Sequence, residues 1–440
     1  MAEVIHVVYC LDDGYAEHTC VSMTSMLANT KSNVHFHVIS NRLSDENKAK
    51  LSYLSKSFPH GSWSFYRMDF DTSGFVIEPT RYLTVETYYR FFIPKILPEL
   101  ERVIYIDGDT VIIGDISELW NEYLEDGIVA GVVQNPGDPE EHLKIFGSKY
   151  YRYFNAGVLL LKLEEFKKLY TLETLPAMIV DLYEKFKSNN VLWCADQEVL
   201  NYLFNGEKYA KFLNCKYNLA DYGSNFYYSL CGQNSRSLRE WNNANNSPII
   251  VHYGGPQKPW HLGNELMLSL RWRLYYKYKV LTPFYDSLDE KRIAEYDRRE
   301  LLTKTESLMP TRLYIQWFWR DIFIHSAKCV KQVIGNRKLV YWGASKHITH
   351  IMVTFTSEDL YPDIVVDGLA ANWGEAVFEY TVQPAEILRG KAEEFFVVLC
   401  METKQARDTV IKLLEEYGYD ENGFVHAYAE AYERENRPLL

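Results

Sequence analysis

VIYIDGDTVI, residues 103–112, sets a pair of carboxylates, Asp107 and Asp109, directly after a run of four apolar residues. Such a short apolar run predicts a buried strand that ends at Asp107. In open α/β sheets, ligands bind beyond the carboxyl ends of the strands. Paired carboxylates at this edge suit a hard divalent cation, whose remaining positions the oxygens of a nucleotide diphosphate would fill. The cation would act as a Lewis acid on the departing diphosphate. The alternative is a solvated turn, because Asp-Gly-Asp is common in turns.

Apolar runs alternate with segments of helical periodicity on both sides of this strand. Further strand patterns occur at Ile5–Cys10, Val34–Ile39, Ser64–Met68, Val129–Val133 and Gly157–Leu161. Helical periodicity marks Tyr15–Asn29 and the stretch from Val85 to about Ile93, which Thr84 would cap. Strands that alternate with helices predict an α/β fold, with a mostly parallel sheet and helices on both faces.

The character of the sequence changes after this region. From Asp286 to Ile334 it is charge-rich, then aromatic and basic, which favours a linker and helices. From Lys338 a new α/β pattern begins, with strand-like runs and an amphipathic helix. A length of 440 residues also favours two domains. We expect a first domain over residues 1–275, a helical linker over 276–336 and a smaller α/β domain over 337–435.

A second candidate feature is the stretch IIVHYGGPQKPW, residues 249–260. A strand pattern delivers His252, whose imidazole is a borderline-soft metal ligand. The following Gly254 and Gly255 allow a close backbone approach, and Lys258 can reach a phosphate as a point charge. A single histidine is more often structural, but the glycine pair and the lysine favour a binding site.

Two further polar clusters have both a structural and a functional interpretation. Asn155, close to Gly157 at a predicted strand start, can hydrogen-bond sugar hydroxyls or can shape the turn. Asp196 and Gln197 stand at a predicted helix start, where the helix dipole stabilises an acid. For Asp196 taken alone, the structural role is the better interpretation.

Composition argues against several classes of protein. The net charge of −12 argues against a nucleic-acid-binding protein, which normally carries a basic surface. The seven cysteines are an odd number without a CxxC pair, so neither a disulfide framework nor a zinc site is indicated. We therefore expect a reduced, cytoplasmic compartment. With no secretory signal pattern and no run of about 18 apolar residues, no transmembrane helix is expected.

Six motifs occur in an order that resembles one enzyme family. They are Leu11-Asp12-Asp13-Gly14-Tyr15, Thr87-Tyr88-Tyr89-Arg90, Tyr105-Ile106-Asp107-Gly108-Asp109, Phe154-Asn155-Ala156-Gly157, Ala195-Asp196-Gln197 and His252-Tyr253-Gly254-Gly255-Pro256-Gln257-Lys258-Pro259-Trp260. In this order the chain is similar to glycosyltransferase family 8, which includes bacterial lipopolysaccharide galactosyl- and glucosyltransferases and glycogenin. The resemblance covers residues 1–275. It implies a GT-A fold, in which one sheet joins a nucleotide-binding half to an acceptor half, followed here by a smaller α/β Rossmann-like domain.

The resemblance also implies roles for individual residues. The implied ligands of Mn²⁺, or of Mg²⁺ in its place, are Asp107, Asp109 and His252. The implied donor contacts are Asp12, Asp13, Tyr15, Arg90, Asp107, Gly108, Asn155, Gly255 and Lys258. The implied catalytic residues, close to the donor sugar, are Arg90, Asp196 and Gln197. Tyr15 would stack on the uracil base, and Gly14 stands where many family members carry Asn. Gly108 offers its backbone but no side chain.

The family retains the anomeric configuration, and two routes give this result. A covalent route needs a carboxylate nucleophile, as in retaining glycosidases, whereas the matching position here is Gln197, with Asp196 beside it. Because an amide is a poor nucleophile, we favour substitution on a single face of the sugar, with the leaving diphosphate oxygen taking the proton of the acceptor. The metal, Lys258 and Arg90 would stabilise the developing charge. Asp196 or Gln197 would orient and stabilise the cationic sugar.

The activity that the resemblance implies is transfer of glucose or galactose from a UDP-sugar to a hydroxyl of a bacterial surface glycan. The acceptor would be a glycan, a glycolipid or a glycoprotein. Two alternatives stay open: a catalytically silent scaffold that binds sugar nucleotides, and a self-glycosylating protein like glycogenin. The intact metal-ligand set and Lys258 weigh against the scaffold, and nothing singles out one acceptor among the 34 tyrosines.

Residues 271–279 and 312–320 mix basic and aromatic side chains, the composition of an interfacial membrane anchor. Family members that act on lipid-linked acceptors often carry such segments, which implies peripheral contact with the inner face of the membrane. The alternative is a helical hinge that packs its aromatic rings on the two domains.

The C-terminal domain opens with Leu339-Val340-Tyr341-Trp342-Gly343-Ala344-Ser345 and resembles the start of a Rossmann-type domain. Ser345 and Ile348 stand at the second and third glycine positions of that fingerprint. The second glycine is the one that lets the backbone approach a pyrophosphate. We therefore favour a structural or interaction domain over a dinucleotide site.

Overall fold

The computed structural model describes most of the chain, with gaps. The described residues are 4–68, 70, 74–77, 84–135, 140–146, 152–204, 208–220, 244, 247–254, 258–261, 271–304, 323, 326–344, 348–377, 379–401 and 403–428. The chain forms two compact units, Met1–Gly223 with Ala244–Arg298, and Ser224–Asn243 with Arg299–Leu440. The predicted boundaries at residues 275 and 337 stay predictions.

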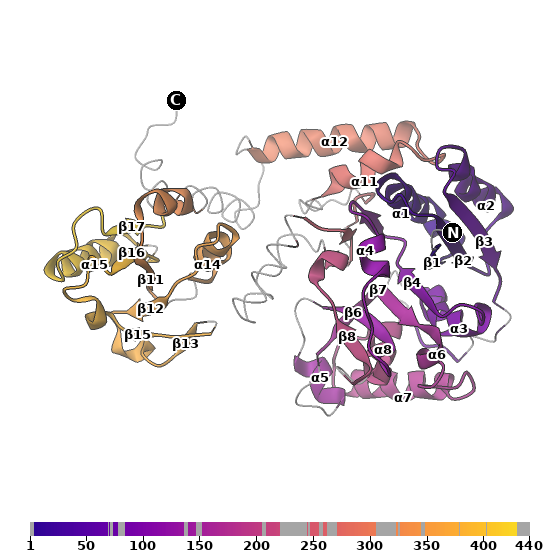
Figure 1. The fold of residues 1–440 in the computed structure, drawn as a ribbon, viewed down its shortest axis with the longest axis horizontal. Helices are drawn as coiled ribbons and strands as arrows, with labels where there is room; N and C mark the ends of the chain where they lie inside the picture. The colour runs from indigo at the N-terminus through magenta and orange to yellow at the C-terminus, as the bar shows by residue number, and fades with distance from the viewer. Residues whose placement is uncertain are drawn as a thin grey trace. The chain divides into compact units, whose positions relative to one another are not determined.

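A seven-stranded sheet forms the centre of the first unit, in the order β3-β2-β1-β4-β7-β6-β8 (Figure 1). Neighbouring strands from β3 to β4 are parallel, as are β6 and β8, whereas β7 is antiparallel to both of its neighbours. The strands are β1 (Ile5–Cys10), β2 (Val34–Ile39), β3 (Gly61–Tyr66), β4 (Arg102–Ile106), β6 (Ala130–Gln134), β7 (Phe154–Lys162) and β8 (Ala210–Phe212). The third strand thus begins and ends earlier than the predicted Ser64–Met68.

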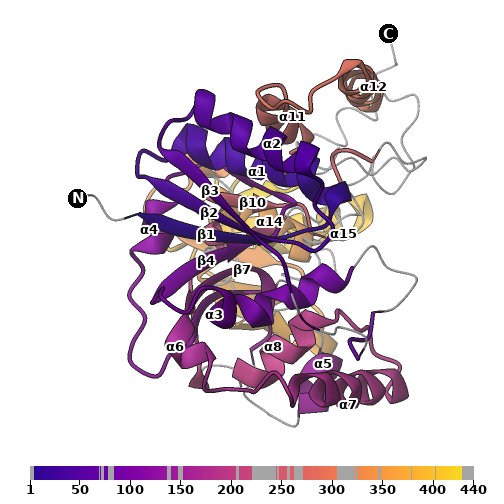
Figure 2. The same ribbon diagram turned by 90° about the vertical axis from the view of Figure 1, so that its right-hand side faces the viewer.

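Helices cover both faces of this sheet (Figure 2). On one face Met23 of α1 and Leu51 of α2 pack in the same core as Val7 of β1. On the other face Ile179 of α7 packs in the same core as Val8. The helices are α1 (Ala16–Asn29), α2 (Asp45–Ser52), α3 (Ile93–Ile96), α4 (Ser117–Trp120), α5 (Glu140–Phe146), α6 (Leu163–Phe166), α7 (Leu175–Ser188), α8 (Asp196–Phe204), α11 (Trp272–Lys279) and α12 (Ser287–Lys304). Short 3₁₀ turns are η1 (Asp13–Tyr15), η2 (Tyr53–Lys56), η3 (Val85–Phe92) and η5 (Cys215–Tyr217).

The stretch predicted as one helix from Val85 to about Ile93 is instead the 3₁₀ turn η3 followed by α3. Pro94 stands in the first turn of α3, a position that suits proline because it has no N–H to lose there. Thr84 is the N-cap residue by position, but its side chain makes no capping hydrogen bond.

A smaller, three-stranded sheet lies beside the main one and has the order β5-β10-β9. Its strands are β5 (Thr110–Ile112), β9 (Leu219–Ala220) and β10 (Ile250–His252). β10 runs antiparallel to β5 and parallel to β9. This sheet therefore brings the segment after the paired carboxylates next to the segment that ends in His252.

Helix α11 buries its aromatic rings in the first unit, in a core that includes Val21 of α1. The buried rings belong to Trp272, Tyr275, Tyr276 and Tyr278. Arg273 and Lys277 lie on its exposed side. The rings of segment 271–279 are thus packed in the core and cannot enter a bilayer without leaving it. Segment 312–320 lies outside the described residues, and no helix in the described part of the chain is long and apolar enough to cross a membrane.

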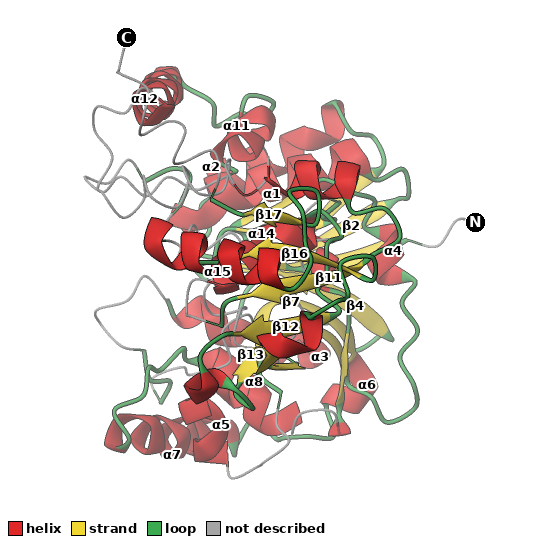
Figure 3. Cartoon of the chain, turned by 90° about the vertical axis from the view of Figure 1, so that its left-hand side faces the viewer, coloured by secondary structure: helices red, strands yellow, loops and turns green. Residues whose placement is uncertain are grey.

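The second unit has a five-stranded parallel sheet in the order β15-β12-β11-β16-β17 (Figure 3). Helices α14 and α15 cover opposite faces, since Phe355 and Leu414 pack in separate cores on the two sides. This α/β arrangement is the one predicted for the C-terminal region. The elements are β11 (Lys338–Trp342), α14 (Ile348–Ser357), β12 (Ile364–Asp367), η7 (Ala370–Asn372), β13 (Ala376–Val377), β14 (Tyr380–Thr381), β15 (Gln383–Pro384), η8 (Ala385–Leu388), β16 (Phe395–Leu399), α15 (Lys404–Glu416) and β17 (Phe424–His426).

Candidate active site

Asp107, Asp109 and His252 come together where the two sheets of the first unit meet. Asp107 follows β4, and its N–H donates to the Gly157 carbonyl of β7 at 2.8 Å. Antiparallel pairing of β10 with β5 places His252 opposite Thr110, next to Asp109. One potential ligand atom from each of the three side chains lies within 4.8 Å of the other two. The register of two strand pairs thus assembles the predicted metal ligands.

Two donors hold one oxygen of Asp107. Its Oδ1 accepts hydrogen bonds from the Tyr105 hydroxyl at 2.6 Å and from the Arg90 guanidinium at 3.1 Å. Arg90 is itself buried, lies over the Tyr105 ring at 4.2 Å and donates to the Ala156 carbonyl at 2.6 Å. The other carboxylate oxygen, Oδ2, lies 4.0 Å from Nε2 of His252. Asp107 therefore directs Oδ2 toward the place that the three ligands share.

His252 presents its Nε2 to the carboxylates and its Nδ1 to an amide. Nε2 lies 3.3 Å from Oδ1 of Asp109, and Nδ1 lies 2.9 Å from Oδ1 of Asn218. A metal-ligating histidine typically bonds such an acceptor through its other ring nitrogen. Asn218 immediately precedes β9, and nothing in the sequence analysis singled it out.

Lys258 is buried against Asp109. Its ammonium is ion-paired with Oδ2 of Asp109 and donates to the Tyr253 carbonyl at 2.6 Å. Burial acts to raise the pKa of Asp109, but Lys258 and His252 outweigh it and hold that pKa well below its usual range. Asp109 therefore stays ionised, as a carboxylate ligand of a metal must be.

Two glycines leave room for close packing at this place. A Cβ on Gly157 would overlap the His252 ring and would lie 2.8 Å from Oδ2 of Asp107. A Cβ on Gly108 would overlap the Thr19 hydroxyl of α1. The middle residue of the Asp-Gly-Asp turn is thus a glycine because α1 packs directly against the turn.

These residues fit a divalent cation. Carboxylate oxygens suit Mg²⁺ and Mn²⁺, and imidazole is a ligand for the later first-row metals. Gly157 has no side chain, so the space beside Oδ2 of Asp107 and the ring of His252 holds no side-chain atom of residue 157. Together, the donor set and the space fit a divalent cation.

Arg90 links the metal ligands to Asp196. Its Nε lies 3.0 Å from Oδ2 of Asp196, whose Oδ1 accepts from the Thr87 hydroxyl. Ala195 has a φ of +59°, a left-handed conformation that non-glycine residues seldom adopt. Burial raises the pKa of Asp196 to about 7, although Arg90 and Thr87 act to lower it. Asp196 is therefore both the first residue of α8 and a buried partner of the site arginine.

The side chain of Gln197 is held at both ends. Its Oε1 accepts from the Ala156 N–H at 3.0 Å and from the Asn155 amide at 3.2 Å. Its Nε2 donates to the Tyr153 hydroxyl at 2.8 Å. Gln197 is thus fixed against the start of β7, and its oxygen is occupied by two donors.

The residues expected at the nucleoside lie after β1. Asp12 accepts the N–H of Tyr15 at 3.0 Å and so caps η1. Oδ1 of Asp13 accepts from the Ser44 N–H at 2.7 Å and from the Asn47 amide at 2.9 Å. In this structure both acids shape the loop and the start of α2.

Contacts among the rings of Tyr15, His18 and Trp260 connect the loop after β1 to residues 258–261, the segment that carries Lys258. The His18 ring of α1 stacks on Trp260, with centroids 3.6 Å apart and planes inclined by 12°. Nδ1 of His18 lies 2.7 Å from the Tyr275 hydroxyl of α11. Tyr15 meets both His18 and Trp260 edge-on. Because Trp260 is two residues from Lys258, this stack anchors the segment that carries the lysine.

The predicted site residues that the structure describes lie at this one edge of the first unit, and Gly255 lies outside the described residues. Sequence reasoning missed the supporting roles of Tyr105, Tyr153 and Asn218. Tyr105 lies in the motif that carries Asp107, and Tyr153 directly precedes the motif that carries Asn155. Asn218 stands in an ordinary loop sequence and gave no signal.

The sequence profile described as Glycosyl transferase family 8 matches residues 6–263, more than half of the chain. The chain belongs to glycosyltransferase family 8. This glycosyltransferase is 27% identical over 315 residues to a lipopolysaccharide 1,2-glucosyltransferase of Escherichia coli K12, across 68% of this chain and 85% of the relative. It is 27% identical over 267 residues to a lipopolysaccharide 1,3-galactosyltransferase of Salmonella typhimurium, across 59% of this chain and 74% of the relative.

The crystal structure of the galactosyltransferase LgtC with donor and acceptor sugar analogues is similar in fold to this family 8 glycosyltransferase. The TM-score is 0.54 at 22% identity, and the match covers 66% of this chain and all of LgtC. The mixed, mostly parallel sheet with flanking helices is therefore a GT-A fold, as the resemblance implied.

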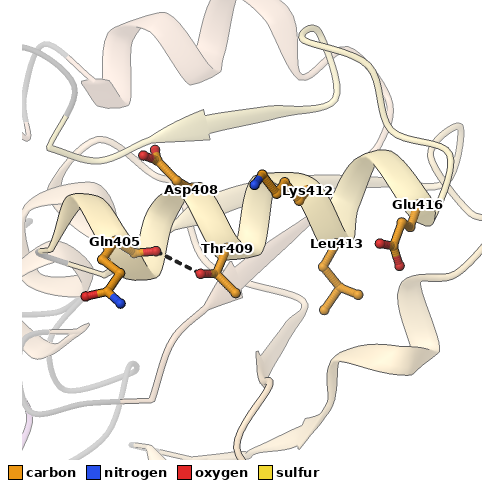
Figure 4. A pocket seen from close by; sticks show the side chains of 6 residues that line it. All are labelled: Gln405, Asp408, Thr409, Lys412, Leu413 and Glu416. Atoms are coloured by element: carbon orange, nitrogen blue, oxygen red, sulfur yellow. Dashed lines mark hydrogen bonds between the residues drawn. The ribbon is translucent and has the colours of Figure 1, made fainter.

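In the second unit of the enzyme, the acidic residue at the carboxyl edge of the sheet is bound by backbone N–H groups. Asp367, at the end of β12, accepts the Ala344 N–H at 2.7 Å and the Leu369 N–H at 2.8 Å, one on each carboxylate oxygen. Backbone donors therefore hold the acid that would meet a ribose in a dinucleotide site. A hollow along one face of α15 is lined by Gln405, Asp408, Thr409, Lys412, Leu413 and Glu416 (Figure 4). Its lining comes from a single helix face on which basic, acidic and apolar groups alternate, so no set of groups converges there.

Proposed function

We propose that this enzyme transfers a hexose, glucose or galactose, from a UDP-sugar to a hydroxyl of a surface-glycan acceptor, with retention of configuration and with Mn²⁺ or Mg²⁺ as cofactor. The observation that carries the proposal is the cluster of Asp107, Asp109 and His252 with Lys258 at its edge. Two carboxylates, an imidazole and an ammonium are the groups that a metal–diphosphate complex needs. The names of two relatives, a glucosyl- and a galactosyltransferase that act on lipopolysaccharide, support a hexose and a bacterial surface glycan.

The position of each residue in the site determines its proposed role. Asp107, Asp109 and His252 hold the cation, which when bound neutralises charge on the departing diphosphate. When the donor binds, the ammonium of Lys258 leaves the carboxylate of Asp109 and pairs with a phosphate oxygen. Arg90, buried and paired with Asp107, adds fixed positive charge beside the donor. Such preorganised charge is commonly the largest contribution to the stabilisation of a transition state.

The hydrogen bonds of Gln197 support substitution on a single face of the sugar. A nucleophile must offer a free lone pair, but the Gln197 oxygen already accepts from Ala156 and Asn155. The neighbouring Asp196 carboxylate is buried against Arg90 and Thr87. In our proposal both side chains orient and stabilise the sugar, and neither forms a bond with it. The leaving diphosphate oxygen takes the proton of the acceptor hydroxyl.

The proposal includes a cytoplasmic site of action and a glycan, glycolipid or glycoprotein acceptor. Contact with a membrane surface is not assigned to the rings of segment 271–279, because these are buried in the core.

Release of UDP from a panel of UDP-sugars tests the proposal. Wild type is followed by NMR with Mn²⁺ and with EDTA, beside Asp109→Asn and the control Asp126→Asn, whose carboxylate is fully exposed. We expect metal-dependent release in wild type and in the control, a loss of about 100-fold or more in Asp109→Asn, and one sugar of the panel preferred.

Two other results support the alternatives. Saturable UDP binding without release, even when candidate acceptors are present, supports the silent scaffold. A gain of hexose mass on the protein itself supports self-glycosylation. Absence of UDP binding contradicts the proposed donor.

A further inference from the structure

A continuous row of hydrogen bonds runs from His252, a predicted metal ligand, through Gln197, a residue predicted to lie near the donor sugar, to Glu198. Its members are His252, Asn218, Asn155, Gln197, Tyr153 and Glu198. They come from β10, the loop before β9, the start of β7 and the start of α8. The row thus joins parts of the first unit that are far apart in sequence.

Backbone donors fix the direction of the first amide in this row. The N–H of Gly157 donates to Asn155 at 3.0 Å, and a backbone N–H can only donate. The atom of Asn155 at that contact is therefore its oxygen. The Asn155 nitrogen must then lie on the other branch, where it donates to Gln197 at 3.2 Å.

The direction of Asn155 determines that of Asn218. The Asn155 oxygen also receives a bond from Asn218 at 2.9 Å, and only the amide nitrogen of Asn218 can donate it. The oxygen of Asn218 consequently faces Nδ1 of His252, 2.9 Å away. An oxygen there can only accept, so Nδ1 must carry a proton. In the neutral ring with a proton on Nδ1 the lone pair is on Nε2, the nitrogen that faces Asp109 at 3.3 Å. Without metal, a proton on Nε2 makes this contact a hydrogen bond to the carboxylate, whereas a cation needs the lone pair.

The opposite end of the row is directed in the same way. The Ala156 N–H donates to Gln197 at 3.0 Å, which identifies the Gln197 oxygen. Its nitrogen donates to the Tyr153 hydroxyl at 2.8 Å, and Tyr153 donates to the buried Glu198 carboxylate at 2.5 Å. Glu198 also accepts the Cys194 N–H at 2.7 Å. Each bond in the row thus agrees with the direction of its neighbours.

We propose that Asn218 is a positioning residue that selects the Nδ1–H tautomer of His252 and so prepares Nε2 as a metal ligand. Asn155 acts behind it, because its oxygen, held by Gly157, decides which way Asn218 faces. Turning Asn218 around would set two amide oxygens against each other and lose the hydrogen bond from Asn218 to Asn155. This inference deepens the proposed function, since it assigns a role to a residue that would touch neither donor nor metal.

The tautomer can be read without metal or donor. Protein labelled with ¹⁵N at histidine gives long-range ¹⁵N–¹H correlations that distinguish the two tautomers, and the signals of His252 are those missing in His252→Gln. We expect a proton on Nδ1 in wild type and in Asn218→Asp, whose carboxylate still accepts from Nδ1. We expect a mixed or Nε2–H ring in Asn218→Leu. A wild-type ring without a proton on Nδ1, or an unchanged ring in Asn218→Leu, overturns the proposal.

Binding of Mn²⁺ alone, measured by electron paramagnetic resonance, gives a second readout. We expect the Kd of Asn218→Leu to rise about 10- to 100-fold. That of Asn218→Asp should rise less, because its carboxylate still accepts from Nδ1 although it loses the bond to Asn155. Equal Mn²⁺ affinity in wild type and Asn218→Leu counts against the positioning role. If wild type binds no Mn²⁺, the metal part of the proposed function fails, while the tautomer spectra still decide the role of Asn218.

Discussion

Gly157 lies so close to His252 that a methyl group on its α-carbon would overlap the imidazole ring. The same methyl group would stand 2.8 Å from Oδ2 of Asp107. We therefore expect Gly157→Ala to displace two metal ligands at once. Because a shift of about 1 Å in a reacting group can cost about 100-fold in rate, UDP release should fall by at least that factor.

Mn²⁺ titration and UDP release measure this effect. Gly368→Ala is the matched control, since a Cβ there meets its nearest neighbour, Trp342, only at 3.9 Å. Unchanged Mn²⁺ binding in Gly157→Ala would contradict the place of the metal ligands described above.

Lys258 and a divalent cation compete for one oxygen of Asp109, because the ammonium is paired with Oδ2. In Lys258→Met the side chain keeps its approximate length and loses its charge. We expect tighter Mn²⁺ binding without donor, and turnover lower by about 100-fold or more because the diphosphate loses a stabilising charge. Lys168→Met, at an exposed position, is the control. Weaker Mn²⁺ binding in Lys258→Met would mean that the lysine supports the metal ligands and does not compete with the metal.

The strand end that carries Asp107 could be predicted from the sequence, because buried strands are short apolar runs and polar residues mark where they end. The start of β7 was predicted too late, since the strand begins at Phe154 and not at Gly157 and so includes Asn155. The meeting of His252 with Asp109 could not be predicted from local pattern. It depends on the antiparallel register of β10 with β5, two strands of three residues each that lie far apart in the chain. The order of the family's motifs implied that His252 and Asp109 share a site, which hydrophobic periodicity could not show.

Composition also left the role of segment 271–279 open, because rings and basic groups suit a membrane surface and a helix packed on a core equally well. The deciding fact is tertiary: α11 packs on α1, and the buried Lys279 is paired with Glu17. Asn218 was beyond prediction for a different reason. Its role consists of the direction of an amide, which depends on Asn155 and not on its own sequence neighbours.

Burial raises the pKa of Asp196 to about 7, above the value of a carboxyl group in an unfolded chain. Between about pH 4 and pH 7 the folded chain thus holds a proton that the unfolded chain has released. The contribution of Asp196 to stability is fully present below pH 4 and is lost as the pH rises through 7. From pH 5 to pH 8 we expect the unfolding free energy of wild type to fall by about 3 kcal/mol relative to Asp196→Asn.

Urea unfolding of both proteins in EDTA at a series of pH values checks this expectation. The comparison with Asp196→Asn removes the contributions of the histidines, which both proteins share. A constant difference across the range would mean that the Arg90 ion pair keeps Asp196 charged throughout.

The stack of His18 on Trp260 predicts a contribution to donor affinity that is separate from chemistry. His18→Ala removes the ring that anchors the Lys258 segment, whereas His18→Phe keeps an aromatic face and loses only the contact with the Tyr275 hydroxyl. An aromatic pair is worth about 0.5–1.5 kcal/mol, so the KM for the UDP-sugar should rise about 2- to 10-fold in His18→Ala, with kcat changed less. Steady-state kinetics of the three proteins should show His18→Phe close to wild type. A fall in kcat with an unchanged KM in His18→Ala would instead place His18 in the chemical step.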